Sequence, residues 1–489
     1  MQPSPPQRDL NKRRGADLYF AASATAQASA LLRYVVLARL LGPTELGMAA
    51  TLVLTQGFFD NISDTGSDRF LIQDRDGDLP AVQRLVQLVY VGRGAAIAAC
   101  LLIFAWPIAL FYKTPALAQG LAILALSPLI LGFLHLDVRR FQRRLDFRAD
   151  AISLIIAETV ALAATVTAAW LTRSFTAVLY GLILRAIVIV IVSHVRAERP
   201  YRLGLSREHA RRLGRFAGPL MVNGLLLFMA TQGDRALVGN QLGVATLGRY
   251  SAVILLIYYP AAMLIRYVQV MYLPALAAAR DNPAERTRLV GLFGGQTMLL
   301  GLGMAAGFAL VAPFLVTTLY GARFTQSAFI VALIGILQAS RFLLVWPTTV
   351  ALSEGRSGAA LAVNTVRLIA YPAALVGGWT LGGLGGVVAG FAFGELAAQM
   401  AGLGILNRAS GRPIWTDFDR VVAFVFACAC ILAWVWTIEH HGRLQAIGLA
   451  LASAAVVGWI VRREKSTIRE SLALADRLTR GLSKRLQRA

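Results

Sequence analysis

The sequence has few charged residues, few cysteines and very few lysines. Charged residues make up 15% of the 489 residues and hydrophobic residues 57%, whereas a globular domain has about 25% charged residues. One water-soluble core cannot hide so much apolar surface. The cysteines Cys100, Cys428 and Cys430 lie in apolar stretches, so we expect no disulfide framework and no metal site from them. None of the four lysines follows a glycine-rich phosphate-binding loop, which argues against an ATP site.

Two polar motifs in the sequence are not expected to bind a metal. The segment DRDGD at 74–78 is similar to the Asp-x-Asp that some sugar-nucleotide transferases use to hold a metal, but no α/β domain surrounds it. We favour a solvated acidic turn there. His440 and His441 fall in a short loop, where a structural or solvated role is favoured over metal binding. The sequence therefore predicts neither a metal nor a bound cofactor.

Apolar residues come in long blocks. A helix needs about 20 such residues to cross a bilayer, and it satisfies its own backbone hydrogen bonds there. The blocks lack the alternation of a transmembrane β-barrel. We predict an all-α integral membrane protein with about fourteen transmembrane helices. The predicted spans are 17–38, 46–63, 86–111, 117–136, 151–171, 176–195, 216–239, 248–273, 290–318, 326–346, 360–380, 383–406, 420–437 and 444–461.

Positive charge is shared unevenly between the predicted loops. With the N-terminus in the cytoplasm, about 35 Lys and Arg fall on the cytoplasmic side and about five on the other, as the positive-inside rule expects. The basic segments are 137–148, 196–215, 279–288 and the tail after 461. Both termini are therefore expected in the cytoplasm. The net charge of +22 follows from this topology, because no basic soluble domain is present to bind nucleic acid.

A short motif occurs twice in the chain. LLGPTELG spans 40–47 and QLGVATLG spans 241–248, and each follows the first span of a six-span group. Six crossings return the chain to its starting side, so both groups have one orientation, as in transporters built from parallel repeats. We predict two parallel six-helix lobes with a cavity between them. The predicted parts are a cytoplasmic segment 1–14, an N-lobe 15–199, a basic linker 200–215, a C-lobe 216–407, two further spans in 408–461 and a basic tail 462–489.

The last two spans and the tail lie beyond the duplicated part. Trp434, Trp436 and Trp459 are typical of anchoring at a membrane interface, and plain packing of these spans is favoured over a groove for a lipid tail. The tail repeats leucine at four-residue spacing among arginines. This pattern predicts a basic amphipathic helix on the cytoplasmic leaflet, with docking of a biosynthetic partner as the alternative.

The residues around both motifs resemble a known family. LARLLGPTELGMAATLVL and GDRALVGNQLGVATLGRYSAV, with the number of spans and the basic loop before the seventh, are similar to the polysaccharide-transport branch of the MOP exporter superfamily, the Wzx-like oligosaccharide flippases. The most telling residues are Ala38 to Gly47, Asp234, Arg235 and Leu242 to Tyr250. The resemblance covers the first twelve spans.

The resemblance implies a function and a location. Such proteins move undecaprenyl-diphosphate-linked oligosaccharide repeat units across the bacterial inner membrane, for exopolysaccharide, O-antigen or capsule synthesis. It also implies a polysaccharide polymerase and glycosyltransferases as partners. Alternating access by two rocking lobes is the expected mechanism.

Charged residues inside the predicted spans form the candidate site. A charge at mid-bilayer costs about 2.5–3.5 kcal/mol, so it is expected to face a cavity or a partner. Because arginines outnumber the deep acids, and buried cations need an anion, we interpret the arginines as the diphosphate and glycan site. The acids are candidates for coupling to a proton or sodium gradient, or for salt bridges. The arginines are Arg33, Arg185, Arg266, Arg341 and Arg367, and the acids are Asp60, Glu158, Asp234 and Glu395.

Each of these residues also has a structural interpretation, which for any single residue is favoured over ligand contact. Asp60 and Asp64 lie four apart on one helix face, where a loop arginine can pair with them. Glu158 and Arg367 fall at equivalent positions of the repeat, where they can form a salt bridge between lobes.

Other functions stay open at this point. A lipid II flippase shares the fold and a cationic cavity, whereas a multidrug or cation antiporter requires a net acidic cavity. A membrane polymerase or ligase needs a large external loop with catalytic residues, and every predicted external loop is short. We therefore expect a transporter and not an enzyme.

Overall fold

The structure, a computed structural model, describes residues 5–410, 417–441 and 443–470. Within these ranges the chain forms helices and no strands, so the all-α membrane fold is confirmed. Nine helical stretches in the described part are long and apolar enough to cross a membrane. The count of about fourteen crossings stays a prediction. The amphipathic helix expected after residue 470 lies outside the described residues.

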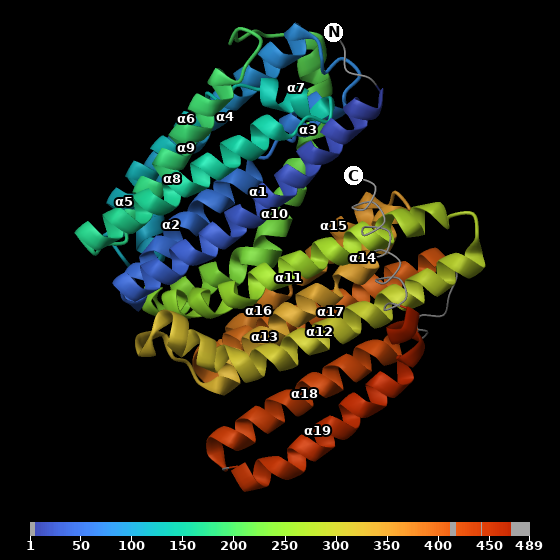
Figure 1. Cartoon of the computed structure of the whole chain (residues 1–489). Helices are drawn as coiled ribbons and strands as arrows, with labels where there is room; N and C mark the ends of the chain where they lie inside the picture. Colours follow the sequence, from blue (N-terminus) through green and yellow to red (C-terminus); the bar gives the residue numbers. More distant parts are fainter. Residues whose placement is uncertain (1–4, 411–416, 442, 471–489) are drawn as a thin grey trace. The chain divides into compact units, whose positions relative to one another are not determined.

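The chain divides into two compact units (Figure 1). Unit 1 comprises the chain up to Ala252 together with Leu319–Phe324. Its helices are α1 (Pro5–Leu40), α2 (Pro43–Ile62), α3 (Ser67–Gln73), α4 (Pro80–Phe111), α5 (Leu117–Leu124), α6 (Leu126–Leu131), α7 (Asp137–Arg143), α8 (Arg148–Thr172), α9 (Ala177–Val195), α10 (Arg207–Leu242), the start of α11 (Val244–Ala278) and η1 (Ala322–Phe324).

Unit 2 comprises Val253–Thr318 and the chain from Thr325 onward. It contains the rest of α11 and most of α12 (Pro283–Tyr320), followed by α13 (Ala328–Leu343), α14 (Val345–Ser353), α15 (Ser357–Arg367), α16 (Ala370–Gly377), η2 (Gly378–Gly382), α17 (Gly383–Ser410), α18 (Phe418–His440) and α19 (Arg443–Arg463). The lobes expected at 15–199 and 216–407 stay a prediction.

Three neighbouring helices in each unit carry six of the nine charged residues of the candidate site, and Asp60, Asp234 and Arg266 lie on α2, α10 and α11. In unit 1, α8 packs against both α1 and α9 (Figure 1). In unit 2, α17 packs against both α13 and α15. Thus one central helix has two flanking helices in each unit, and side chains from all three can meet.

The core of unit 2 is built around Trp346, which is fully buried. Its indole Nε1–H donates to the carbonyl oxygen of Val290 at 3.0 Å, so the ring joins the start of α14 to α12. The rings of Tyr272 and Phe293 stack beside it with centroids 4.4 Å apart. Large buried aromatic surfaces with a satisfied polar atom hold helices together without an unpaired group.

The repeated motif makes a direct contact with its own second copy. Gly42 and Pro43 end α1 and begin α2, while Gly243, with φ at +83°, separates α10 from α11. A Cβ on Gly47 would lie 1.7 Å from the carbonyl oxygen of Val244, and one on Gly248 would lie 2.0 Å from that of Pro43. The two segments therefore cross backbone to backbone within unit 1, and only glycine permits that approach.

A buried carboxylate organises the polar end of unit 1. Asp137 accepts hydrogen bonds from the backbone N–H groups of Glu198 and Arg199, both at 2.8 Å, and from the Arg140 Nε at 3.0 Å. Burial acts to raise the pKa of the Asp137 carboxyl, but the hydrogen bonds from Arg199, Arg140 and Glu198 hold that pKa below its ordinary value. The carboxylate thus stays charged at neutral pH and fixes the chain that follows α9.

The DRDGD segment is paired rather than solvated. Arg212, in α10, contacts both Asp74 at 2.5 Å and Asp76 at 2.6 Å. Arg143 donates to the backbone carbonyl of Ile72 at 3.0 Å and also to that of Asp74, which caps the end of α3. The acidic turn expected from the sequence is therefore an attachment point for the basic start of α10.

We expect Gly47→Ala and Gly248→Ala to lower stability by about 1–3 kcal/mol, because the added Cβ overlaps a backbone carbonyl and the helices must separate. In an exposed helix the same change is usually stabilising. Thermal unfolding of the purified protein measures the effect. Gly42→Ala, in the same motif but with nothing within 4 Å of its Cβ, is the matched control. A midpoint that drops equally in the control contradicts the close crossing.

Asp137→Asn is expected to release the segment after α9. The amide places a donor nitrogen where two backbone N–H groups need an acceptor, so hydrogen exchange at the Glu198 and Arg199 amides should accelerate. Exchange detected by mass spectrometry on this peptide is the readout. Glu208→Gln, an exposed change in α10, should leave exchange unaltered. If exchange at the Glu198 and Arg199 amides stays slow in Asp137→Asn, the Asp137 carboxylate does not hold this segment in place.

Candidate functional site

Glu158 on α8 lies between two arginines in unit 1. Its Oε2 is 3.3 Å from the Arg33 guanidinium of α1, and its Oε1 is 2.6 Å from the Nε of Arg185 on α9. The Glu158 side chain is 8% exposed, whereas that of Arg185 is 32% exposed. One carboxylate thus shares two guanidinium groups, and part of the cationic surface stays accessible.

Asp60, near the end of α2, belongs to the same neighbourhood. It lies close enough to Arg185 for their charges to interact. The guanidinium of Arg93, on α4, donates to the backbone oxygen of Asp60 at 2.9 Å and to the Ser63 hydroxyl at 2.9 Å. Arg93 lies inside the predicted span 86–111 but was not among the residues predicted for the site. The expectation that a charge inside a span faces a cavity or a partner applies to it as well.

Glu395 on α17 is the counterpart of Glu158 in unit 2. Its oxygens contact the Arg341 Nε of α13 at 3.1 Å, and the Arg367 Nε and Nη2 of α15 at 2.9 and 2.6 Å. The two Arg367 bonds form a fork, the strongest arrangement for this pair of groups. All three side chains are at most 10% exposed.

Each triad is completed within its own unit. Glu158 and Arg367 fall at equivalent positions of the repeat, so an acid in one half stands where a base stands in the other. Glu158 and Arg367 each pair with residues of their own unit. These contacts leave no need for the interlobe salt bridge considered from the sequence.

Each triad carries two guanidinium groups for one carboxylate. A buried ion pair is stable only when its charges and hydrogen bonds are matched. Counted over its three side chains alone, each triad has two cations and one anion. This excess has the sign that would attract an anionic ligand.

Arg266 and Asp234 stand apart from the triads. Arg266, in α11, is exposed and forms no ion pair among the described residues. Asp234, in α10, is fully buried, and its Oδ2 accepts a hydrogen bond from the Tyr250 hydroxyl at 2.6 Å. Asp234 therefore holds α10 to the start of α11, a partnership between distant side chains that the sequence pattern does not reveal.

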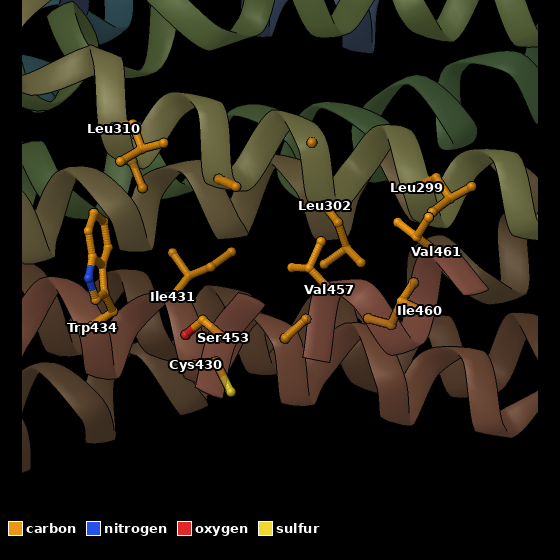
Figure 2. A pocket seen from close by; sticks show the side chains of 14 residues that line it. Leu299, Leu302, Leu310, Cys430, Ile431, Trp434, Ser453, Val457, Ile460 and Val461 are labelled. Atoms are coloured by element: carbon orange, nitrogen blue, oxygen red, sulfur yellow. The ribbon is translucent and has the colours of Figure 1, made fainter. Parts of the chain in front are cut away.

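An apolar pocket lies between α12, α18 and α19 in unit 2 (Figure 2). Its volume is about 490 Å³. Leu302 and Leu310 of α12 face Ile431 and Trp434 of α18, with Val457 of α19 closing the lining (Figure 2). Such a pocket suits a hydrocarbon chain and not a sugar. The final two helices thus form a groove with α12, where the sequence favoured plain packing.

Known proteins are similar to this chain in sequence and in fold. A family model described as "Polysaccharide biosynthesis protein" matches residues 36–329. The succinoglycan biosynthesis transport protein ExoT of Rhizobium meliloti (strain 1021) is 24% identical over 310 residues, which cover 63% of this chain and 62% of that protein. The match therefore spans less than two thirds of that relative.

Two solved structures share the fold. The lipid II flippase MurJ in an inward closed conformation has a TM-score of 0.66 at 12% identity, over 92% of this chain and 99% of MurJ. An inward-facing multidrug resistance MATE transporter of the MOP superfamily has a TM-score of 0.62 at 14% identity, over 79% of this chain and 94% of the transporter. The family model and the relative confirm the resemblance to proteins of polysaccharide biosynthesis and transport, and the two solved structures show the shared fold.

We expect Glu158→Gln and Glu395→Gln each to destabilise the protein by about 3–5 kcal/mol, because each removes the buried charge that two guanidinium groups contact. The unfolding midpoint in detergent reports this. Glu285→Gln removes an exposed pair with Arg288 and should change the midpoint little. If the unfolding midpoints of the two triad variants equal that of Glu285→Gln, the triads do not stabilise the fold.

Proposed function

We propose that this chain, which belongs to the polysaccharide biosynthesis protein family, flips undecaprenyl-diphosphate-linked oligosaccharide repeat units across the inner membrane. The product would supply synthesis of a surface polysaccharide. The observation that carries the proposal is the pair of triads, in which two guanidinium groups share one carboxylate. A multi-pass membrane protein with such a charge surplus suits an anionic cargo.

The diphosphate is the group that these arginines suit. Its oxygens match the planar fork of a guanidinium, which donates two parallel hydrogen bonds. Arg266 is exposed and has no ion pair among the described residues, so its donors are available. Each unit would add positive charge of its own, from Arg33 and Arg185 in unit 1 and from Arg341 and Arg367 in unit 2. Arg185 is the most accessible of the four.

The lipid part of the cargo needs an apolar path beside the charged one. The pocket between α12, α18 and α19 is lined by leucine, isoleucine, valine and alanine side chains with a tryptophan at one end. We assign it to the isoprenoid chain. A carrier of this kind would hold the diphosphate near arginines and the isoprenoid chain in the apolar groove. Each part of the cargo would then lie in surroundings of matching polarity.

Movement would follow alternating access, with both termini in the cytoplasm. No phosphate-binding loop occurs in the sequence, and we propose a proton or sodium gradient, acting through Glu158, Asp234, Glu395 or Asp60, as the driving force. The glycosyltransferases that build the repeat unit and the polymerase that joins units are the expected partners.

The sign of the charge weighs against a cation or multidrug antiporter. A cationic drug needs a net acidic site, whereas both triads have more arginines than acids. A lipid II flippase also carries a diphosphate lipid. The family model that covers residues 36–329 supports the oligosaccharide over lipid II.

Deletion of the gene should leave complete, diphosphate-linked repeat units on the cytoplasmic face, because assembly precedes flipping. Lipid extraction and mass spectrometry of the attached glycan measure the accumulation. Normal lipid carriers together with normal surface glycan would rule out this cargo. Loss of viability with arrested peptidoglycan synthesis would instead favour lipid II.

Arg266→Ala should abolish export without unfolding the protein, because the side chain is exposed and forms no ion pair among the described residues. Surface glycan in the complemented deletion strain is the readout, with membrane level and thermal midpoint as checks on folding. Arg323→Ala, an equally exposed arginine in η1, should leave export intact. Normal export by Arg266→Ala would remove this residue from the cargo site.

A further inference from the structure

A second arginine cluster lies at one end of unit 2, outside the spans that carry the triads. The turn Glu354–Gly355–Arg356 joins α14 to α15, with Gly355 in the left-handed region at φ +74°. Beside it lies the connection from α11 to α12, where Arg280 is in the turn and Arg286 is in the first turns of α12. Two segments distant in the sequence thus bring three arginines around one glutamate.

The contacts around Glu354 are specific. Its carboxylate forms an ion pair with Arg286 and lies 3.2 Å from the Arg356 Nε. The Arg280 guanidinium donates to the backbone carbonyl of Glu354 at 2.9 Å, a contact that leaves the charge of Arg280 uncompensated. Asp281 is exposed and forms no ion pair among the described residues. Three cations therefore surround one carboxylate, and the cluster stays positive even when Asp281 is counted.

The arginines of this cluster repel one another. Both Arg280 and Arg356 lie near enough to Arg286 for unfavourable charge interaction. Arg286 is 22% exposed and Glu354 12%, so water screens this repulsion only in part. Like charges held together in this way are stabilised by a bridging anion. Arg356, at 53% exposure, and the exposed Arg280 leave donors open to such an anion.

We infer that Arg280, Arg286 and Arg356 form a binding site for a phosphate group, separate from the arginines of the spans. A phosphate has several charged oxygens and can bridge guanidinium groups from two turns at once. The predicted span of α12 begins at 290, which would place Arg286 at the level of the lipid headgroups. The phosphate comes either from a lipid headgroup or from a free phosphate, and the chemistry of the site is the same for both.

Pyrophosphate binding to the full chain tests this site. The protein carries a fluorophore on Thr287→Cys, an exposed position beside Arg286, with its native cysteines replaced by alanine, and it is held in phosphatidylcholine nanodiscs. Sodium pyrophosphate should give a saturable signal. Arg286→Gln and Arg356→Gln should each weaken the apparent affinity at least tenfold, because each removes a cation that contacts the anion.

Two variants serve as matched controls. Arg288 lies two residues from Arg286, but Glu285 and Glu470 already neutralise its charge. The Arg288→Gln variant should therefore bind pyrophosphate with the affinity of the parent. The Arg266→Ala variant should also bind pyrophosphate with the affinity of the parent. The binding test at this cluster is therefore independent of the export test at Arg266. Arg286→Lys, which retains charge but not the fork, should bind with intermediate affinity.

Nanodiscs containing phosphatidylglycerol distinguish the two sources of phosphate. If this lipid raises the pyrophosphate concentration that half-saturates the parent, and excess pyrophosphate restores the full signal, a lipid headgroup occupies the site. If the signal is unchanged by the lipid, a free phosphate does. No saturable signal in either disc, or equal signals from the parent and Arg286→Gln, overturns the proposal.

Discussion

The cost of a charge inside a membrane governs the interior of both units. An isolated carboxylate or guanidinium is unstable in apolar surroundings, and both units meet this constraint with one glutamate held between two arginines. Because the partners of Glu158 come from α1 and α9, and those of Glu395 from α13 and α15, the pairing also selects which helices lie together. The same contacts that hold the helices leave an excess of positive charge.

Much of this arrangement could be predicted from the sequence, because the bilayer imposes a simple rule on length and polarity. The apolar blocks predicted the helices, and the intramembrane charges Arg33, Glu158 and Arg185 turned out to lie together. The repeat predicted equivalent positions for the two copies of the Leu-Gly motif. Symmetry relates positions without saying whether they touch, so the contact of Gly47 with Val244 came only from the structure.

The partners of the charged residues could not be predicted, because pairing depends on distances between helices that sequence spacing does not contain. The repeat positions of Glu158 and Arg367 allowed a salt bridge between the lobes, yet Glu158 contacts residues of its own unit. Asp234 was a candidate for ion coupling because it lies in a predicted span, yet it accepts a hydrogen bond from Tyr250. The groove of α12, α18 and α19 has no charged residue to mark it, and apolar lining looks like apolar core in any hydropathy pattern.

The triads also set a condition on how an anionic cargo would bind in the proposed cycle. Glu395 is held by a guanidinium fork from Arg367, and a phosphate would use the same pair of donors. A diphosphate that bound Arg367 would therefore compete with Glu395, and the cargo would bind at the expense of a contact between α15 and α17. The same competition at Glu158, whose partner Arg185 is more accessible, would couple cargo binding to helix packing in each unit.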